Sequence, residues 1–246
     1  MDFGLFMYCT IGRRHELEKG MAGRSNELYQ RMLNEIAQYA TFADEAGYFG
    51  FGHPEHHLQI EGFEISNDPC LMAMWLGQHT KRMKIITCGF VSTTNNPLKK
   101  DKKITTLDHM LGGRFGAGLV RGYQARWVEN YKVKPELNAV GPWNAKGPED
   151  DLNREYFSEF VDIVVKALGQ ETLQHRGKFW NFPPEGFVNP HDHPVYVNYG
   201  DGVSENMAVE SVGIAPGPYQ TDIPLYGGFS QSLTTAKFWA KYKGRP

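Results

Sequence analysis

The chain has 246 residues, of which 41% are hydrophobic and 22% are charged, so it can bury a large core as one large domain or two small ones. Its formal net charge of −2 argues against a nucleic acid or an anionic membrane as its partner. Cys9, Cys70 and Cys88 are widely spaced, which favours reduced intracellular thiols over a disulfide framework. The chain runs from Met1 straight into an apolar segment and has no stretch of about 18 apolar residues, so we expect a soluble, cytoplasmic protein.

Strand and helix patterns alternate through the first two thirds of the chain. Four segments are apolar and bounded by turn residues, as buried strands are, and four others carry apolar side chains at helical spacing. The predicted strands are residues 2–8, 48–53, 84–91 and 115–121, and the predicted helices are residues 26–46, 69 to about 81, 97–112 and 151–168. Four strand–helix units in a row predict a parallel sheet with helical crossovers.

The remaining segments are less regular. Residues 124–150 are rich in Pro, Gly and Asn and are predicted to form a long loop. Residues 172–223 contain short apolar runs broken by Pro and Gly, which predicts hairpins inserted into the main fold. A fifth core strand is predicted at residues 224–229, and a helix begins near Thr234. Loops of this length inside a compact domain are usually functional.

Three histidines and a glutamate lie at and directly after the end of the second predicted strand. His53, Glu55, His56 and His57 lie within five positions, and a parallel sheet would bring them to the rim where α/β enzymes hold their catalytic groups. Because the pKa of histidine lies near neutrality, a histidine held by a carboxylate is suited to moving protons. A loop of solvated histidines is the simpler alternative. A zinc site of the His-Glu-x-x-His type needs a helix, which Pro54 would break.

The segment Gly116-Ala-Gly118-Leu-Val-Arg-Gly122 is only superficially a dinucleotide fingerprint. Its glycines lie within and at the end of a strand, whereas that fingerprint lies in the turn that opens a helix. Such glycines allow a flat ligand or a neighbouring backbone to approach closely. Arg121, at the end of the strand, is expected at the same rim as His56, where it could also simply pair with a carboxylate.

A run of hydroxyl side chains follows the fifth predicted strand. In Ser230-Gln-Ser232-Leu-Thr-Thr235 a strand end leads into a helix start. The free N–H groups and the positive end of the helix dipole suit a phosphate there. Ordinary N-capping by Ser232 or Thr234 explains the same residues equally well.

Taken together, these segments resemble the bacterial luciferase-like flavin monooxygenases, and the resemblance covers most of the chain. It implies a (β/α)8 TIM barrel with insertions that uses reduced FMN or, in some branches, the deazaflavin F420. Members activate O2 to a flavin C4a-peroxide, which oxidises an aldehyde, alkane, sulfonate or terpene. The segments that carry the resemblance are Asp2-Phe-Gly-Leu-Phe6, Glu55-His56-His57, Leu107-Asp108-His-Met-Leu-Gly-Gly-Arg114, Gly118-Leu-Val-Arg-Gly122 and Ser230-Gln-Ser232-Leu-Thr-Thr235.

The resemblance assigns catalysis to the histidine motif. His56 matches the catalytic histidine of the family beside the flavin, and either Glu55 or His57 is expected to orient it. Four positions depart from the family pattern: Gly52 stands where a tryptophan is usual, Asn96 where a histidine is usual, Lys99 where an arginine is usual and Lys102 where a glutamate is usual.

The resemblance also implies a set of cofactor-binding residues. Asp108 and Arg121 match positions that shape the flavin site, and Ser232 and Thr235 match hydroxyls that bind the phosphate. Lys99 replaces a family arginine and is expected to contact the phosphate as a point charge, without the fork of a guanidinium.

A closed barrel needs eight strands, whereas only five core strands are predicted, so we expect one domain over residues 1–246 that is an incomplete barrel. Either its C-terminal strands are missing, or it is a shortened relative closed by its hairpins. Open sheet edges predict that the chain alone self-associates, whereas a full-length form is expected to be a homodimer.

The functional expectation is an FMN-linked monooxygenase that oxidises a small organic substrate with O2 and receives FMNH2 from a separate reductase. An F420-dependent dehydrogenase on the same fold is one alternative. A non-catalytic flavin-binding protein is another, because Gly52 and Asn96 alter the expected pocket.

Overall fold

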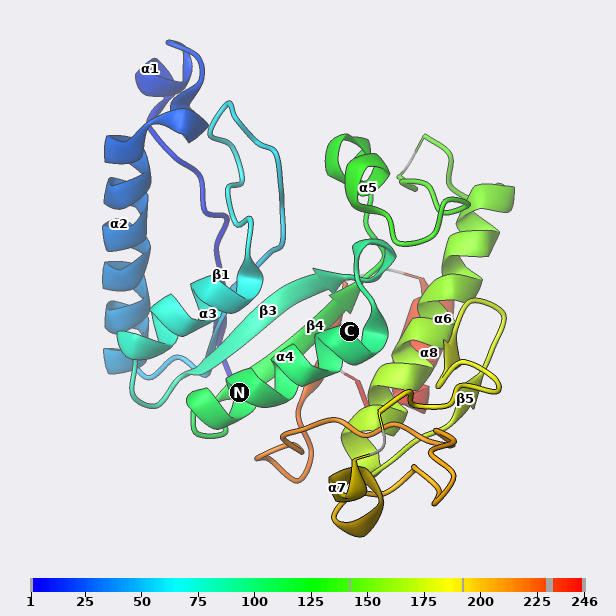
Figure 1. Cartoon of the computed structure of the whole chain (residues 1–246). Coiled ribbons are helices and arrows are strands. Elements are labelled where there is room, and N and C mark those ends of the chain that lie inside the picture. The colour runs from blue at the N-terminus through cyan, green and yellow to red at the C-terminus, as the bar shows by residue number, and fades with distance from the viewer. Residues whose placement is uncertain (1, 142, 192, 229–231, 245–246) are drawn as a thin grey trace.

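The centre of the molecule is a sheet of five strands that are all parallel, in the order β1-β2-β3-β4-β7. We describe it from a computed structural model, which covers residues 2–141, 143–191, 193–228 and 232–244 (Figure 1). The strands are β1 (Gly4–Phe6), β2 (Gly50–His53), β3 (Lys84–Val91), β4 (Phe115–Val120) and β7 (Leu225–Gly227). The predicted α/β architecture with five parallel core strands is therefore confirmed.

Helices follow most of these strands and lie along the sheet (Figure 1). The predicted helices are present, and side chains cap three of them: the Ser25, Asp68 and Asn96 side chains accept hydrogen bonds from backbone N–H groups of the first turn. The helices are α1 (Arg14–Leu17), α2 (Asn26–Glu45), α3 (Pro69–Gln78), α4 (Pro97–Met110), α5 (Ala125–Tyr131), α6 (Pro148–Gly169), α7 (Pro194–Asn198) and α8 (Leu233–Lys241), with 3-10 turns η1 (Ala22–Arg24) and η2 (Ser92–Thr94).

The two faces of the sheet are built differently. Phe51, Ile85 and Phe115 are fully buried in the core that the helices cover. On the opposite face the strands carry many glycines, and β3 and β4 approach closely at Gly89 and Gly118. A Cβ atom at Gly89 would lie 2.6 Å from the carbonyl carbon of Gly118. Of the two explanations for these glycines, the structure shows the close approach of a neighbouring backbone.

Residues 124–150 are predicted to form one long loop. This prediction is wrong, because they contain α5. This helix has only seven residues, too few to be stable alone, and it is held by burial of Trp127 and Val128 against Val91 and Ala139. The composition of the segment hides that contact, since the Pro and Gly residues lie after α5.

Residues 172–223 form one of the predicted hairpins, between β5 (His175–Arg176) and β6 (Asn181–Phe182). The apolar run from Pro194 to Tyr199 is a helical turn, α7, and not an extended segment. Pro194 occupies its first turn, and the His193 side chain accepts a hydrogen bond from the N–H of Val195 at 3.3 Å. Proline at a first turn favours a helix over a strand.

A buried carboxylate joins the end of α2 to the start of β3. Asp44 accepts hydrogen bonds from the backbone N–H groups of Lys81, Arg82 and Met83 at 3.0, 2.9 and 2.6 Å. Although burial alone would raise the pKa of Asp44, these donors bring it below its ordinary value. One side chain thus fixes the turn that sets the position of β3.

We predict that Asp44→Ala lowers the free energy of unfolding by about 3 kcal/mol, because it leaves several backbone donors without their charged acceptor. Urea denaturation followed by circular dichroism measures the change. The exposed neighbour supplies the control, and Glu45→Ala should alter stability little. Equal effects of the two substitutions would contradict the role of Asp44.

Candidate active site

The candidate site lies at the edge of the sheet where the parallel strands end. His56 follows the end of β2, Arg121 follows β4, and Ser232 follows β7. Because these strands are parallel, the three residues lie at the same rim, as the sequence predicts. Figure 1 shows the loop after β2 and helix α5 beyond this edge.

His56 is held in an aromatic and acidic environment. Its side chain is buried, and its Nδ1 lies 3.1 Å from Oε2 of Glu64. The ring of Tyr8 is stacked against it at 6.1 Å between centroids, and Tyr123 meets it edge-on at 6.4 Å. Within the described part of the chain, Nε2 of His56 makes no hydrogen bond, which leaves that nitrogen for a ligand.

The local electrostatics favour a neutral imidazole that can still gain a proton. Burial lowers the pKa of His56 below its ordinary value of 6.5, and the Glu64 carboxylate opposes that shift because it stabilises the imidazolium. A neutral ring with a carboxylate at one nitrogen can accept a proton at the other nitrogen and return it.

Glu64 is the residue that sequence reasoning missed. It is held by Gln124, whose Nε2 donates to Oε2 of Glu64 at 3.1 Å. Gln124 in turn accepts a hydrogen bond from the indole N–H of Trp127 at 3.1 Å. These contacts join the loop after β2 to α5. Glu64 lies eight positions after His56 in an irregular loop, so no motif spacing indicates it.

Glu55 and His57 do not contact the His56 ring, contrary to the expectation that one of them orients it. They pair with each other, with His57 Nε2 at 3.0 Å from Oε1 of Glu55. The second carboxylate oxygen of Glu55 accepts from the N–H of Val91 at 2.9 Å. In an extended segment alternate residues point to opposite sides, so Glu55 and His57 turn away from His56.

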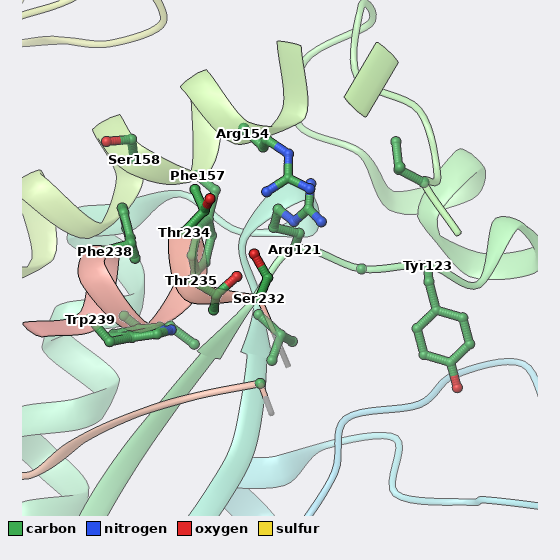
Figure 2. A pocket seen from close by; sticks show the side chains of 15 residues that line it. Arg121, Tyr123, Arg154, Phe157, Ser158, Ser232, Thr234, Thr235, Phe238 and Trp239 are labelled. Carbon is green, nitrogen blue, oxygen red and sulfur yellow. The ribbon is translucent and has the colours of Figure 1, made fainter. Parts of the chain in front are cut away.

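A second feature of the rim is a cavity of about 520 Å³ between the end of β4, α6 and the start of α8. Hydroxyl groups of Ser232, Thr234 and Thr235 line it, together with guanidinium groups of Arg121 and Arg154 (Figure 2). Tyr123 also lines it. Since Tyr123 contacts the His56 ring as well, it connects the cavity to the histidine.

Asp150 orients the two arginines of this cavity. This nearly fully buried carboxylate pairs with Arg121 through one oxygen, and its other oxygen lies 3.0 Å from Nε of Arg154. Burial would raise the pKa of Asp150, but the arginine contacts hold it below its ordinary value. The alternative that Arg121 pairs with a carboxylate is thus correct. Because two guanidinium groups share this one carboxylate, the three side chains together keep a net positive charge.

Ser232 occupies the N-cap position of α8, with extended backbone, and its carbonyl accepts from the N–H of Ala236 at 3.1 Å. The first turn of α8 therefore directs the positive end of its dipole toward the cavity that Ser232 and Thr235 line. Ser230 of the same motif lies outside the described residues.

Two predicted cofactor residues are not brought to this cavity. Asp108 lies at the opposite end of the sheet, near the start of β4. Its carboxylate accepts from the side-chain amide of Gln220 at 2.7 Å, and that amide also donates to the carbonyl of Phe115. Lys99 lies at the correct rim, in the first turn of α4, but its side chain is exposed and does not line the cavity.

His53 also lies outside the site. It is completely buried, and neither ring nitrogen has a well-aligned hydrogen bond among the described residues. Burial lowers its pKa to about 4, so this ring is neutral and belongs to the core. In the same described part of the chain, no group of three or more His, Cys, Asp or Glu side chains could hold a metal ion. No described helix is both long enough and apolar enough to cross a membrane.

Residues 1–210 match the family described as luciferase-like monooxygenase, which is most of the chain. The chain belongs to this family. The alkanal monooxygenase alpha chain of Photobacterium leiognathi is 28% identical over 157 residues, which are 64% of this chain and 40% of that protein. The chain spans about half the length, or less, of the curated relatives it matches.

Solved structures share the fold of this luciferase-like chain. The monooxygenase RslO1 from Streptomyces bottropensis matches with a TM-score of 0.70 and 19% identity, over 99% of this chain and 58% of that one. The oxygenating constituent of 3,6-diketocamphane monooxygenase from Pseudomonas putida, in complex with FMN, matches with a TM-score of 0.67 and 19% identity. The match covers 100% of this chain and 56% of that one. An F420-dependent secondary alcohol dehydrogenase matches less well, with a TM-score of 0.55 and 15% identity, over 92% of this chain and 51% of that one. The expected fold and family are confirmed, and structural neighbours bind FMN or F420.

We predict that Glu64→Gln lowers the pKa of His56 further below 6.5, because the substitution removes the negative charge that favours the protonated ring. The titration of the His56 ring protons by NMR measures the shift. Glu61→Gln is the matched control, since Glu61 lies in the same loop but pairs with Arg126. An unchanged or raised pKa of His56 in the Glu64 variant would show that the carboxylate does not act on the ring.

Proposed function

We propose that this luciferase-like chain is the flavin-binding part of an FMN-dependent monooxygenase that oxidises a small organic substrate with O2 and receives reduced FMN from a separate reductase. One observation carries the proposal: a buried His56–Glu64 pair and a cationic, hydroxyl-lined cavity lie at one rim and share Tyr123. The first feature can handle a proton and the second can hold a phosphate, which is the combination that a flavin mononucleotide enzyme needs.

The cavity residues fit the phosphate of FMN. Ser232, Thr234 and Thr235 supply hydroxyl donors at a helix N-terminus, and Arg121 supplies a guanidinium already oriented by Asp150. A phosphate there would meet donors and positive charge from two elements that are far apart in sequence. When bound, reduced FMN supplies the electrons that make O2 reactive.

The residues around His56 have two tasks. The His56 ring accepts or donates a proton at Nε2, while the charge of Glu64, 3.1 Å from Nδ1, stabilises the protonated ring. Tyr8 stacks on the ring and Tyr123 meets it edge-on, although both tyrosines are about half exposed. A substrate over this surface would displace water from the imidazole, which strengthens every polar interaction there.

The cofactor test is an anaerobic titration of the chain with reduced FMN and, separately, with reduced F420, followed by exposure to O2. Preferred binding of reduced FMN and consumption of O2 support the monooxygenase. Preferred binding of F420 without O2 consumption favours the dehydrogenase, for which an F420-dependent structural neighbour is the supporting observation. Flavin binding with unchanged O2 reactivity would leave a flavin-binding protein and contradict the proposal.

We predict that His56→Ala keeps FMN binding within a few-fold but slows oxidation of reduced FMN and substrate by about 100-fold, a usual contribution of a general acid–base. Stopped-flow absorbance measures both steps. His15→Ala supplies the control, because His15 is exposed on α1 and does not line the cavity. Unchanged turnover would remove His56 from the mechanism.

Phosphate recognition gives a separate prediction. The double variant Ser232→Ala, Thr235→Ala should weaken the binding of FMN by about 2–3 kcal/mol, because each hydrogen bond to a charged group contributes over 1 kcal/mol. Riboflavin, which lacks the phosphate, should bind almost unchanged. Fluorescence quenching measures both affinities. Thr106→Ala is the control, because it removes an exposed hydroxyl from a helix elsewhere in the chain. Equal losses for FMN and riboflavin would mean that the hydroxyls only support α8.

A further inference from the structure

A second, smaller cavity lies behind the histidine motif, on the side to which Glu55 and His57 point. Its volume is about 180 Å³, and its walls come from the loop after β2, the start of α3, α4 and the end of α5. None of the residues that line it lines the larger cavity described above. The function proposed for the rim makes no use of it.

One wall of this cavity contains a buried lysine, Lys100. Lys100 is 3% exposed, and its Nζ lies 3.9 Å from the centre of the Phe90 ring. Within the described part of the chain, Nζ has neither a hydrogen-bond acceptor nor a salt-bridge partner within 4 Å. The aromatic ring stabilises the charge but accepts no conventional hydrogen bond, so the ammonium donors remain available to water or to a ligand in the cavity.

The acidic groups of the cavity are already engaged. Both oxygens of Glu55 accept hydrogen bonds, one from His57 and one from the N–H of Val91. One oxygen of Asp68, Oδ1, accepts from two N–H groups at the start of α3, at 2.9 and 3.1 Å. Burial lowers the pKa of Lys100, while the charge of Glu55 opposes that shift. The cavity thus has unused donors on Lys100, and the adjacent Lys103 also lines it.

We propose that this cavity binds a small carboxylate monoanion, whose oxygens accept hydrogen bonds from Lys100. A volume of about 180 Å³ holds on the order of six water molecules, so the ligand has only a few non-hydrogen atoms. One negative charge complements Lys100. Glu55 and Asp68 line the same walls, and they would repel a phosphate dianion about twice as strongly as a monoanion.

The test uses the whole chain and 13C-labelled acetate, with binding followed by NMR titration. We expect saturable binding that Lys100→Met weakens by about 10-fold or more, since the loss is a hydrogen bond to a charged group. Lys99→Met is the matched control, because Lys99 is the exposed neighbour on the same helix and does not line the cavity. Its affinity for acetate should equal that of the unmodified chain.

Two further variants show which cavity binds acetate and whether the loss of binding is caused by unfolding. The double variant Ser232→Ala, Thr235→Ala should bind acetate as the unmodified chain does, and a loss there would assign the anion to the larger cavity and overturn the proposal. If circular dichroism shows that Lys100→Met is unfolded, the partly exposed Lys103→Met takes its place, with a several-fold loss expected. No saturable binding of acetate, or equal affinity with and without the lysine tested, would also overturn the proposal.

Discussion

The parallel pairing of the five strands is the constraint on which the site depends. Each strand of the sheet runs in the same direction, so every loop that follows a strand emerges at one edge. His56, Arg121 and Ser232 are 176 residues apart at their extremes, yet they reach one rim for this reason alone. If β4 itself ran antiparallel to β2 and β3, Arg121 would lie at the opposite edge of the sheet, and the cationic cavity would be separated from the histidine.

The basic groups of the rim share a second physical pattern. Each is oriented by a carboxylate that comes from another position in the chain: His56 by Glu64, His57 by Glu55, and Arg121 by Asp150. Such buried pairs gain little net stability, because desolvation of the charges offsets much of their attraction. What they do provide is a fixed direction for each nitrogen, which a ligand or a transferred proton requires. Lys100 departs from this pattern, since it faces an aromatic ring.

The sequence predicts the framework well because local signals and tertiary structure agree there. The third strand, residues 84–91, has the predicted bounds, since an apolar run flanked by turn residues is buried on both sides. Glu64 could not be predicted, because its contact with His56 depends on an irregular loop that no periodicity describes. Helix α5 was hidden for a related reason: burial of Trp127, a tertiary contact, stabilises it. The position of Asp108 was predictable in principle, because a crossover helix must return to the starting edge of the sheet.

The glycine-rich face of the sheet restricts how this scaffold can change. A Cβ atom at Gly89 would lie 2.6 Å from the carbonyl carbon of Gly118, and one at Gly118 would overlap the carbonyl oxygen of Thr87. The obstructing atoms belong to the backbone of the neighbouring strand, so a side chain at either position would push β3 and β4 apart. New side chains that alter ligand preference are accommodated more easily in the segments between the strands. In this fold, chemical diversification and structural integrity are assigned to separate parts of the chain.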